Sequence, residues 1–310
     1  MFSNVGHRPL TQQRVRLAAT SDGKLVSLQH DYVNHTSILD NYEENCGEAT
    51  PYLYSVPNLR VSSGLARRNI GTPTFMRGPG AVPGLFATES AMDELAIKLT
   101  MDPLEFRLLN EPQKDESNGL PFSSRHFQEC LRVGAEKFGW SKRNPAVGSM
   151  RESDFVLGWG MAACSWAAER FPCEANVELR SDGTVRVTCA TQDIGTGTYT
   201  ILAQIVSAKT GVPLERISVI LGDTSLPPGP LSGGSMGTAS VLPAVSAASD
   251  QAISNLLYTT TQAANSPFVG KTFNELALTN GTIHEKNNPS ESAIPYSVKI
   301  EDLLDAPVAT

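Results

Sequence analysis

Three turns of the kind that favours β-hairpins limit the folds open to this chain. Each contains Asp-Gly or Asn-Gly and lies between two short segments that carry apolar residues, and around Ser181–Gly183 these residues alternate with polar ones. Glycine suits such turns because it tolerates positive φ, and the alternation is typical of strands with one buried face. Hairpins in place of strictly alternating strand and helix units predict an α+β fold with mixed or antiparallel sheets. The three turns are Ser21–Gly23, Ser181–Gly183 and Asn280–Gly281.

Helical periodicity occupies the region between the first two turns. From Leu85 to Leu99, apolar residues recur at intervals of three, four and seven, which predicts a helix with one apolar face. A second helix is expected to begin at Asp102 as cap, with Pro103 in its first turn and Glu105 in the capping-box position. A third is expected from about Ser123 to Gly139. We therefore expect layered units with helices on one face of each sheet.

A polar stretch, residues 142–154, is the best candidate for a domain boundary. It contains Pro145 and Gly148, and strand patterns resume after it. A chain of 310 residues suggests two domains, at roughly 100 to 200 residues each. We therefore expect two layered α/β-sandwich units, residues 1–148 and 149–310.

The charge balance and the hydropathy argue against some partners. The chain has 25 Lys and Arg residues against 32 Asp and Glu residues, and no basic run could follow a phosphate backbone, so nucleic acid is not expected. The most apolar stretch, Val156–Ala168, has 13 residues and two glycines, whereas a membrane span needs about 20 apolar residues. The first seven residues lack the features of a secretion signal. A cytoplasmic location is the default expectation, and export would require the signal of a partner.

The cysteines and histidines predict neither a metal site nor a disulfide framework. Five of each are present, without a C-x-x-C motif and without two histidines four residues apart. We expect most of the thiols to be buried. Cys46-Gly47-Glu48 resembles a nucleophile beside a base, but the acidic segment 40–44 disfavours a thiolate, and a solvated loop is the preferred interpretation.

The loop Gln192–Thr198 is the most informative local feature. Its glycines lie between a predicted strand that ends near Ala190 and an amphipathic helix, where the backbone can approach a ligand closely. The free N–H groups and the dipole at the start of that helix favour an anion. The third glycine of a Rossmann fingerprint is missing, and an ordinary tight turn is the alternative interpretation.

Two further glycine-rich loops precede helices. Residues Ser232–Thr238 follow a short apolar strand, Ile217–Leu221, and precede a helix expected from about Ala239; taken alone, they could be a linker. In Phe75–Gly80, Arg77 offers a fixed cationic donor among residues with exposed backbone, although taken alone it could equally be a surface arginine. Three such loops together favour an extended cofactor that carries phosphate.

Five segments, taken in order, resemble one family, the molybdenum-binding subunit of the xanthine dehydrogenase and aldehyde oxidase family. The similarity covers nearly the whole chain, from Gly6 to about Leu304. It is greatest to bacterial three-subunit aldehyde oxidoreductases, which residues 69–73 and 119–124 also resemble. The five segments are Thr74–Gly80, Glu89–Ala96, Met101–Leu104, Gln192–Thr198 and Ser232–Thr238.

The resemblance implies a molybdenum–molybdopterin cofactor, in bacteria usually in the cytosine dinucleotide form, with the metal held by the pterin dithiolene and by no protein side chain. It also implies a molybdenum hydroxylase that oxidises aldehydes or N-heterocycles with water as the oxygen source, a glutamate as general base, and partner subunits that carry iron–sulfur clusters and FAD. Arg77 and Gly78 would lie near the molybdenum. The residues implied to contact the cofactor are Met76, Arg77, Gly78, Gln192, Asp193, Gly195, Thr196, Gly197, Thr198, Ser232, Gly233, Gly234, Ser235, Met236, Gly237 and Thr238.

The sequence departs from the family pattern at both ends. The 310 residues contain neither the family's upstream glutamine–glycine and G-G-x-F-G segments nor its G-x-G-E motif, which carries the general-base glutamate. Glu48 cannot replace that base because it precedes the cofactor loops in the chain. We therefore expect an internal fragment of the subunit with no catalytic residue of its own. The alternatives are an inactive structural or interaction fragment and, with weaker support, an independent dinucleotide-binding module.

Overall fold

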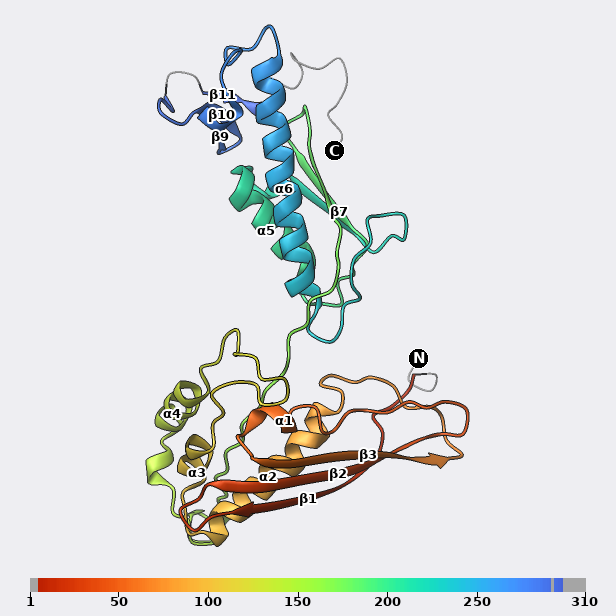
Figure 1. Cartoon of the computed structure of the whole chain (residues 1–310), viewed down its shortest axis with the longest axis vertical. Helices are drawn as coiled ribbons and strands as arrows, with labels where there is room; N and C mark the ends of the chain where they lie inside the picture. Colours follow the sequence, from red (N-terminus) through yellow and green to blue (C-terminus); the bar gives the residue numbers. More distant parts are fainter. Residues whose placement is uncertain (1–4, 291–292, 298–310) are drawn as a thin grey trace. The chain divides into compact units, whose positions relative to one another are not determined.

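The computed structural model describes residues 5–290 and 293–297, and the chain divides into two compact units (Figure 1). The first unit is Met1–Trp166 and the second is Ala167–Thr310. The resemblance expected as far as Leu304 therefore ends in residues that lie outside the described ones.

The division between Trp166 and Ala167 falls later than the polar stretch 142–154 that the sequence suggested. Residues 151–156 form a short hairpin in the first unit, of β4 (Arg151–Glu152) and β5 (Phe155–Val156). Beyond it, the Met161 carbonyl accepts a hydrogen bond from Arg107, and the Ala163 N–H donates to Glu89. These bonds hold residues 161–163 to the first unit, so the boundary moves past them.

A mixed three-stranded sheet forms one layer of the first unit. Its order is β1-β2-β3, with β1 and β2 antiparallel around the turn at Gly23 and β2 and β3 parallel. The predicted first hairpin is confirmed, with Leu17 opposite Leu28. The strands are β1 (Thr11–Ala19), β2 (Leu25–Ser37) and β3 (Asn58–Arg68).

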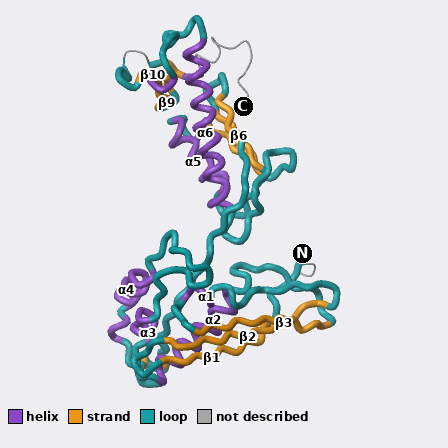
Figure 2. Tube along the Cα trace, viewed as in Figure 1, coloured by secondary structure: helices purple, strands orange, loops and turns teal. Residues whose placement is uncertain are grey.

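Helices form the second layer of this unit, with α2 packed against β1 (Figure 2). The Asp102 side chain accepts a hydrogen bond from the Leu104 N–H at 2.8 Å, which confirms the predicted cap. The helix expected from Ser123 begins later, at Phe127, and ends as predicted at Gly139, where φ is 81°. The helices are α1 (Thr50–Leu53), α2 (Ala81–Lys98), α3 (Pro103–Leu109), α4 (Phe127–Phe138) and the 3₁₀ turn η1 (Trp140–Lys142).

A buried ionic network joins the helices of the first unit. The Arg107 side chain is fully buried and donates to Glu89 Oε2 at 2.8 Å and to Asp93 Oδ1 at 2.7 Å. Glu89 also accepts hydrogen bonds from the Tyr54 hydroxyl and the Ala163 N–H, both at 2.6 Å. Because every charge has a partner, the network can be buried beside the apolar core of Met92 and its neighbours.

The second unit repeats the layered arrangement. Its sheet has the order β6-β7-β8, with β6 and β7 antiparallel and β7 and β8 parallel. Helices α5 and α6 lie side by side against this sheet (Figures 1 and 2). The elements are β6 (Asn176–Leu179), β7 (Val185–Cys189), α5 (Thr198–Thr210), η2 (Leu214–Arg216), β8 (Ile217–Leu221) and α6 (Gly237–Gln262).

A small antiparallel sheet of order β11-β10-β9 completes the second unit. Its β9–β10 hairpin turns at Asn280–Gly281, so all three predicted hairpins are present. Mixed and antiparallel sheets with helices on one face confirm the predicted α+β class. The elements are η3 (Phe273–Glu275), β9 (Leu276–Thr279), β10 (Thr282–Glu285) and β11 (Ile294–Pro295).

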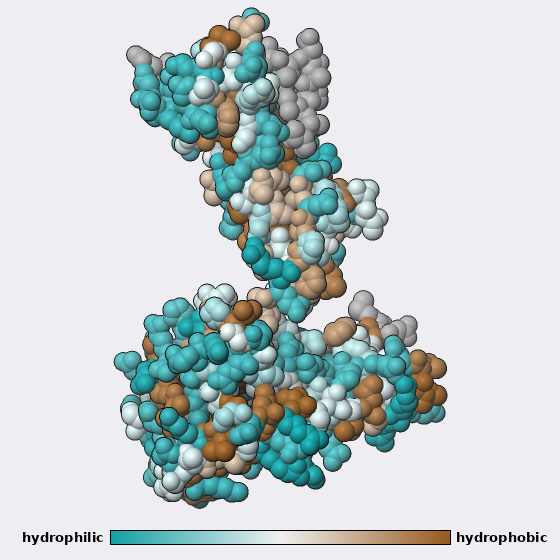
Figure 3. All heavy atoms as spheres, in the orientation of Figure 1, coloured by the Kyte–Doolittle hydropathy of each residue, from teal (hydrophilic) through white to brown (hydrophobic). Residues whose placement is uncertain are grey.

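The surface view shows hydrophilic and hydrophobic side chains mixed over the displayed faces of both units (Figure 3). Within the described ranges, no helix has both the length and the apolar character that crossing a membrane requires.

The cysteines are more varied than expected. Cys46 and Cys189 are buried and Cys173 is half-buried, but Cys130 and Cys164 are exposed, so the expectation of mostly buried thiols is wrong. Cys46 and Gly47 are buried beneath α2, where a solvated loop was expected.

Candidate functional site

The loop Gln192–Thr198 joins β7 to α5, as predicted. Gly195 and Gly197 have φ of 96° and 79°, values that side-chain-bearing residues rarely adopt. Gly197 is the N-cap of α5, and space is open around both glycines. The loop therefore needs glycine for its backbone path.

The N–H groups of this loop are already bound by a side chain of the same loop. Asp193 Oδ1 accepts from the N–H groups of Gly195 at 2.8 Å, Thr196 at 2.9 Å and Gly197 at 3.3 Å. Asp193 Oδ2 accepts from the Tyr199 N–H at 3.3 Å. The expectation of bare glycine N–H groups in this loop is therefore wrong, because the Asp193 carboxylate binds them in the place of an external anion.

The bound N–H groups also change the ionisation of Asp193. Desolvation acts to raise the pKa of Asp193, but the backbone hydrogen bonds outweigh it and hold the pKa below its ordinary value. The carboxylate is therefore ionised at neutral pH, and it neutralises the positive end of the α5 dipole.

The start of α6 offers free backbone donors. Its N-cap, Met236, provides no side-chain cap, and among the described residues the N–H groups of Gly237, Thr238 and Ala239 have no hydrogen-bond partner. A Cβ built on Gly237 would meet no atom within 4 Å, so the approach to these groups is open. The helix has 26 residues, so its dipole adds to the attraction of an anion.

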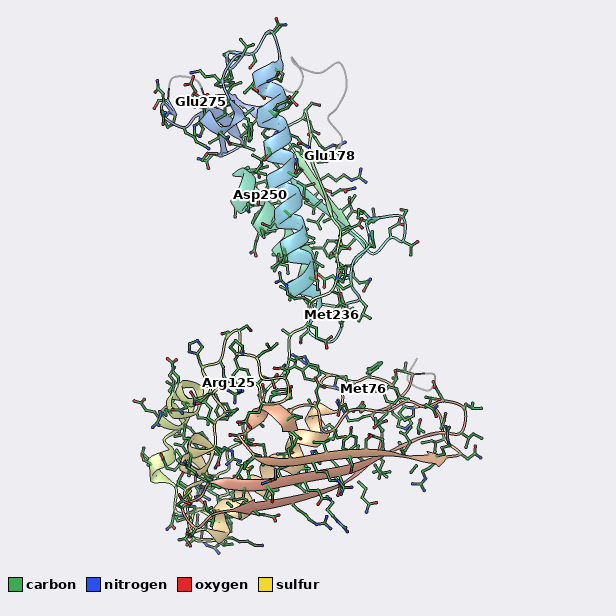
Figure 4. The ribbon with its side chains drawn as sticks, viewed as in Figure 1. Met76, Arg125, Glu178, Met236, Asp250 and Glu275 are labelled. Atoms are coloured by element: carbon green, nitrogen blue, oxygen red, sulfur yellow. The ribbon has the colours of Figure 1, made fainter. Side chains whose placement is uncertain are left out.

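The loop before α6 has a constrained backbone. Gly234 and Ser235 have φ of 56° and 54°, and positive φ at a serine is uncommon. Strain of this kind concentrates at ligand-binding and catalytic segments. Met236, labelled in Figure 4, lies at the end of α6 where this loop enters the helix.

The two loops contact each other directly. The Ser232 N–H donates to Gln192 Oε1 at 3.0 Å, and the Ser232 hydroxyl donates to the Gln192 carbonyl. Next to Gln192, the Thr191 hydroxyl donates to the Pro230 carbonyl at 2.9 Å. The structure thus brings the predicted segments Gln192–Thr198 and Ser232–Thr238 together in the second unit.

The combined surface of the two loops presents polar but mostly uncharged groups. Asp193 is the one charged residue in the two segments, and the remaining donors are backbone N–H groups and hydroxyls such as those of Thr196 and Ser235. These groups can hold an anionic or polar ligand by hydrogen bonds. The oxygens of Asp193, the one carboxylate among them, are engaged by backbone N–H groups of its own loop.

In the first unit, buried charges shape the loop Phe75–Gly80. Arg8 donates to the carbonyls of Arg77 at 2.6 Å and Gly78 at 3.2 Å. Glu44, whose side chain is fully buried, accepts from Arg8 at 3.1 Å and from the Gly80 N–H at 2.8 Å. These contacts fix the backbone of the loop and leave the side chain of Arg77 exposed.

The side chain of Arg77 has no hydrogen-bond or ion-pair partner among the described residues, and Met76 beside it is labelled in Figure 4. Sequence reasoning found this arginine but missed Arg8 and Glu44, which position its loop. In the sequence, Glu44 is recognisable only as part of the acidic segment 40–44. Its partner Arg8 lies 36 residues away, and no local pattern connects them.

No group of three or more His, Cys, Asp or Glu side chains suited to a metal ion occurs in residues 5–290 and 293–297.

The Cys46 thiol is not a nucleophile, because burial, and then Glu44 and Glu43, raise its pKa to about 12.

Comparison with known proteins relates both units to one kind of domain. Sequence families described as molybdopterin cofactor-binding domain match residues 1–111 and residues 133–300. The aldehyde oxidoreductase molybdenum-binding subunit PaoC of Escherichia coli K12 is 40% identical over 236 residues, which cover 76% of this chain and 32% of PaoC. The putative xanthine dehydrogenase molybdenum-binding subunit XdhA of the same organism is 29% identical over 226 residues, 69% of this chain and 30% of XdhA.

Solved structures agree on the fold. Quinoline 2-oxidoreductase from Pseudomonas putida 86 superposes with a TM-score of 0.72 at 19% identity, over 94% of this chain and 40% of that chain. The aldehyde oxidoreductase from Desulfovibrio desulfuricans superposes with a TM-score of 0.66 at 26% identity, over 81% of this chain and 29% of that chain. This chain spans about a third of the length of the curated relatives named above. With both units matched, the chain belongs to the molybdopterin cofactor-binding domain family.

Proposed function

We propose that this chain forms part of the cofactor site in the molybdenum-binding subunit of a molybdenum hydroxylase, which oxidises aldehydes or N-heterocycles with water as the oxygen source. The observation that carries the proposal is the contact between two glycine-rich loops at the open start of α6. The names of the relatives support the same function.

The residues at the start of α6 suit a molybdopterin cofactor. Its phosphate groups need N–H and hydroxyl donors, and the N–H groups of Gly237, Thr238 and Ala239 are free and open to approach. The resemblance implies that the pterin dithiolene would hold the metal, so the chain would not need to supply side-chain ligands. When bound, the cofactor supplies the redox chemistry and the activated oxygen.

We propose cofactor contacts in each unit, taken by itself. In the first unit, Arg77 and Gly78 would lie near the molybdenum, Met76 would also contact the cofactor, and the exposed guanidinium of Arg77 would supply a fixed positive charge. In the second unit, the loop before α6 would bind an anionic part of the cofactor, and Gln192 would orient that loop through Ser232. The remaining predicted contacts in residues 195–198 and 232–238 would surround the pterin and the nucleotide.

We also propose a form of the cofactor and a kind of partner subunit. A cytosine dinucleotide form, and iron–sulfur and FAD groups on partner subunits, follow from the resemblance. The description of two relatives as molybdenum-binding subunits supports a division of the redox groups among separate chains.

We also propose that the 310-residue chain, in the absence of any other polypeptide, does not turn over substrate. The G-x-G-E motif of the family base does not occur in the sequence, and general base catalysis contributes about 100- to 10,000-fold. Measurable oxidation of an aldehyde or a purine by the purified 310-residue chain would contradict this part. Cofactor binding without turnover agrees with it.

A substitution at the start of α6 tests the cofactor site. Gly237→Val adds a side chain over the free N–H groups, where space is open and the backbone is helical, so the fold is retained. Gly197→Val is a poorer test because φ of 79° at Gly197 strains any side-chain-bearing residue. The chain would be purified from a host that makes the cofactor, and molybdenum and oxidised pterin would be measured.

The expected result is molybdenum and pterin in the wild-type chain and the loss of both from Gly237→Val. Gly134→Val is the matched control, since Gly134 is also helical, with open space around it, but lies in α4 of the first unit. Normal cofactor content in Gly237→Val would refute the assignment of this loop. A wild-type chain without pterin would favour the alternative of a structural fragment.

A further inference from the structure

Two thiols meet beneath the two loops of the second unit. The Sγ atoms of Cys173 and Cys189 are 3.8 Å apart, and both cysteines are free. Cys189 is the last residue of β7 and is fully buried, whereas Cys173 precedes β6 and is half-buried. Asn176 of β6 pairs with Thr188 of β7, so the antiparallel pairing holds the start of β6 beside the end of β7.

The sulfur atoms are close enough for a covalent bond after a small movement. An S–S bond is about 2.05 Å long, so the two atoms need to approach each other by about 1.8 Å. Rotation of the Cys173 side chain can provide most of that, since Cys173 is only partly enclosed. The β6–β7 pairing holds Cys189 in place, and Cys173 is half-exposed. Disulfide formation is therefore favoured for this pair over the other three cysteines.

The segment Pro227–Pro230 connects this pair to the loop before α6. The Ala190 N–H, next to Cys189, donates to the Pro227 carbonyl at 2.7 Å, and the Glu174 N–H, next to Cys173, donates to the Pro228 carbonyl at 2.8 Å. Gly229 lies so close that a Cβ there would be 2.7 Å from the Cys189 sulfur. Movement of this sulfur therefore acts on the segment that leads directly to Ser232.

We propose that Cys173 and Cys189 form a reversible disulfide that fixes the segment Pro227–Pro230 and, through it, the loop Ser232–Thr238. The disulfide does not depend on the proposed function, whereas any effect on cofactor retention rests on it. A disulfide at this position would couple the order of the loop to the oxidation state of the surroundings.

The chemistry needs a two-electron oxidant, for which we name a peroxide. The Cys173 thiol gives up its proton, its sulfur attacks one peroxide oxygen, and the O–O bond breaks; the leaving hydroxide takes up that proton, so a sulfenic acid and water result. The sulfur of Cys189 then attacks the sulfenic sulfur, the S–S bond forms, and the sulfenic hydroxide leaves as a second water with the proton of the Cys189 thiol. In total, two thiols lose two electrons and two protons, and one hydrogen peroxide becomes two waters.

The pair stays reduced unless an oxidant is added. Burial, and then the neighbouring Cys189, raise the pKa of Cys173 to about 12, so little thiolate exists near neutral pH. The reaction is consequently slow, and sustained exposure to peroxide is needed.

The test oxidises the purified full chain with hydrogen peroxide and counts the thiols that can be alkylated after unfolding. The expected count falls from the five of the sequence to three, and returns to five after reduction with dithiothreitol. Peptide mapping should show a peptide linked through Cys173 and Cys189. Hydrogen exchange in residues 227–238 should slow on oxidation and recover on reduction.

Two variants keep the result interpretable. Cys173→Ala should abolish the linked peptide, because the remaining Cys189 is buried and has no second thiol beside it. Cys130→Ser, at an exposed cysteine in the first unit, should leave the link unchanged. The linked peptide would stand even if the chain bound no cofactor, so the two proposals can fail separately.

Other outcomes overturn the proposal. One is a pair that remains fully alkylatable while Cys130 and Cys164 are oxidised. Another is oxidation of Cys173 to sulfinic acid without a link to Cys189. A third is a metal ion bound to the pair in the untreated chain. Native mass spectrometry would show it as added mass that a chelator removes and that the Cys173→Ala chain does not carry.

Discussion

Residue Asp193 shows how one side chain can decide the chemistry of a loop. Its carboxylate accepts four backbone N–H groups, including that of Tyr199 in the first turn of α5. The same groups would otherwise attract an external anion. The glycine N–H groups of this loop are therefore bound within the chain, whereas those of Gly237, Thr238 and Ala239 at the start of α6 have no partner among the described residues.

Neutralising Asp193 should loosen this loop. Asp193→Ala removes all four acceptor contacts, so we expect a lower melting temperature and upfield shifts of the Gly195 and Gly197 amide protons. Asp193→Asn keeps one oxygen acceptor but loses the charge, and its effect should be smaller. Asp182→Asn, in a hairpin turn of the same unit, is the matched control and should leave both amide signals in place. Unchanged signals in Asp193→Ala would contradict the hydrogen bonds.

The pH dependence has a defined sign. Because the folded pKa of Asp193 is lowered, its contribution to stability is complete above the ordinary aspartate pKa near 4 and is lost as the pH falls through the lowered value. The two amide signals should therefore move only below about pH 4 in the wild type. In Asp193→Asn, which has no carboxyl group at this position, the two amide signals should stay in place over the same pH range.

Single residues were the hardest features to predict from the sequence. The glycines and their conformational role could be read from the loop Gln192–Thr198, but the competition of Asp193 for the N–H groups depends on its rotamer. The pairing of Arg8 with Glu44, and of Cys173 with Cys189, depends on contacts between segments distant in sequence. The residues adjacent to each of these side chains in the sequence do not predict such contacts.

At the scale of elements, α2 depends on a close approach that only glycine permits. A Cβ on Gly84 would lie 1.8 Å from the Cys46 carbonyl oxygen. Burial of Gly84 therefore lets the helix lie directly on the backbone of residues 45–47, beside the loop that carries Arg77. The position of that loop follows from the position of this helix.

Two glycine-to-alanine changes should have opposite effects. Gly84→Ala overpacks α2 against Cys46, and we expect a loss of about 1–3 kcal/mol in the free energy of unfolding. Gly134→Ala, in α4 with open space around it, should gain about 0.5–1 kcal/mol. Urea unfolding with an unchanged slope measures both. A Gly84→Ala chain as stable as the wild type would show that the helix is free to move.

Local elements were predictable where their signals lie within a few residues. The three hairpins, the strand Ile217–Leu221 and the cap at Asp102 all follow from short patterns, and all are present. The parallel pairing of β3 with β2 was not predicted, because 20 residues separate the two strands and include α1. The late start of α4, at Phe127, shows that Ser123 and Ser124 do not cap it.

At the scale of the whole chain, each unit has its own apolar core. One is built around Met92 and Phe106, and the other around Val187 and Leu202. The sequence indicated two units but placed the boundary in residues 142–154, because polar composition does not reveal that residues 161–163 bind Arg107 and Glu89. The buried network thus sets the extent of the first unit.

The Arg107 network lies within the first unit, so its loss should destabilise that unit alone. Arg107→Met leaves the Glu89 carboxylate buried without its counter-charge, and breaking a buried pair costs about 3–5 kcal/mol. Peptide-resolved hydrogen exchange should therefore accelerate in residues 81–109, while residues 237–262, in the other core, keep the wild-type rate. Arg132→Met, at an exposed position on α4, should change stability by less than about 0.5 kcal/mol. Equal acceleration in both ranges would mean that the chain unfolds as a single cooperative body, and the separation of the two cores would then carry no energetic meaning.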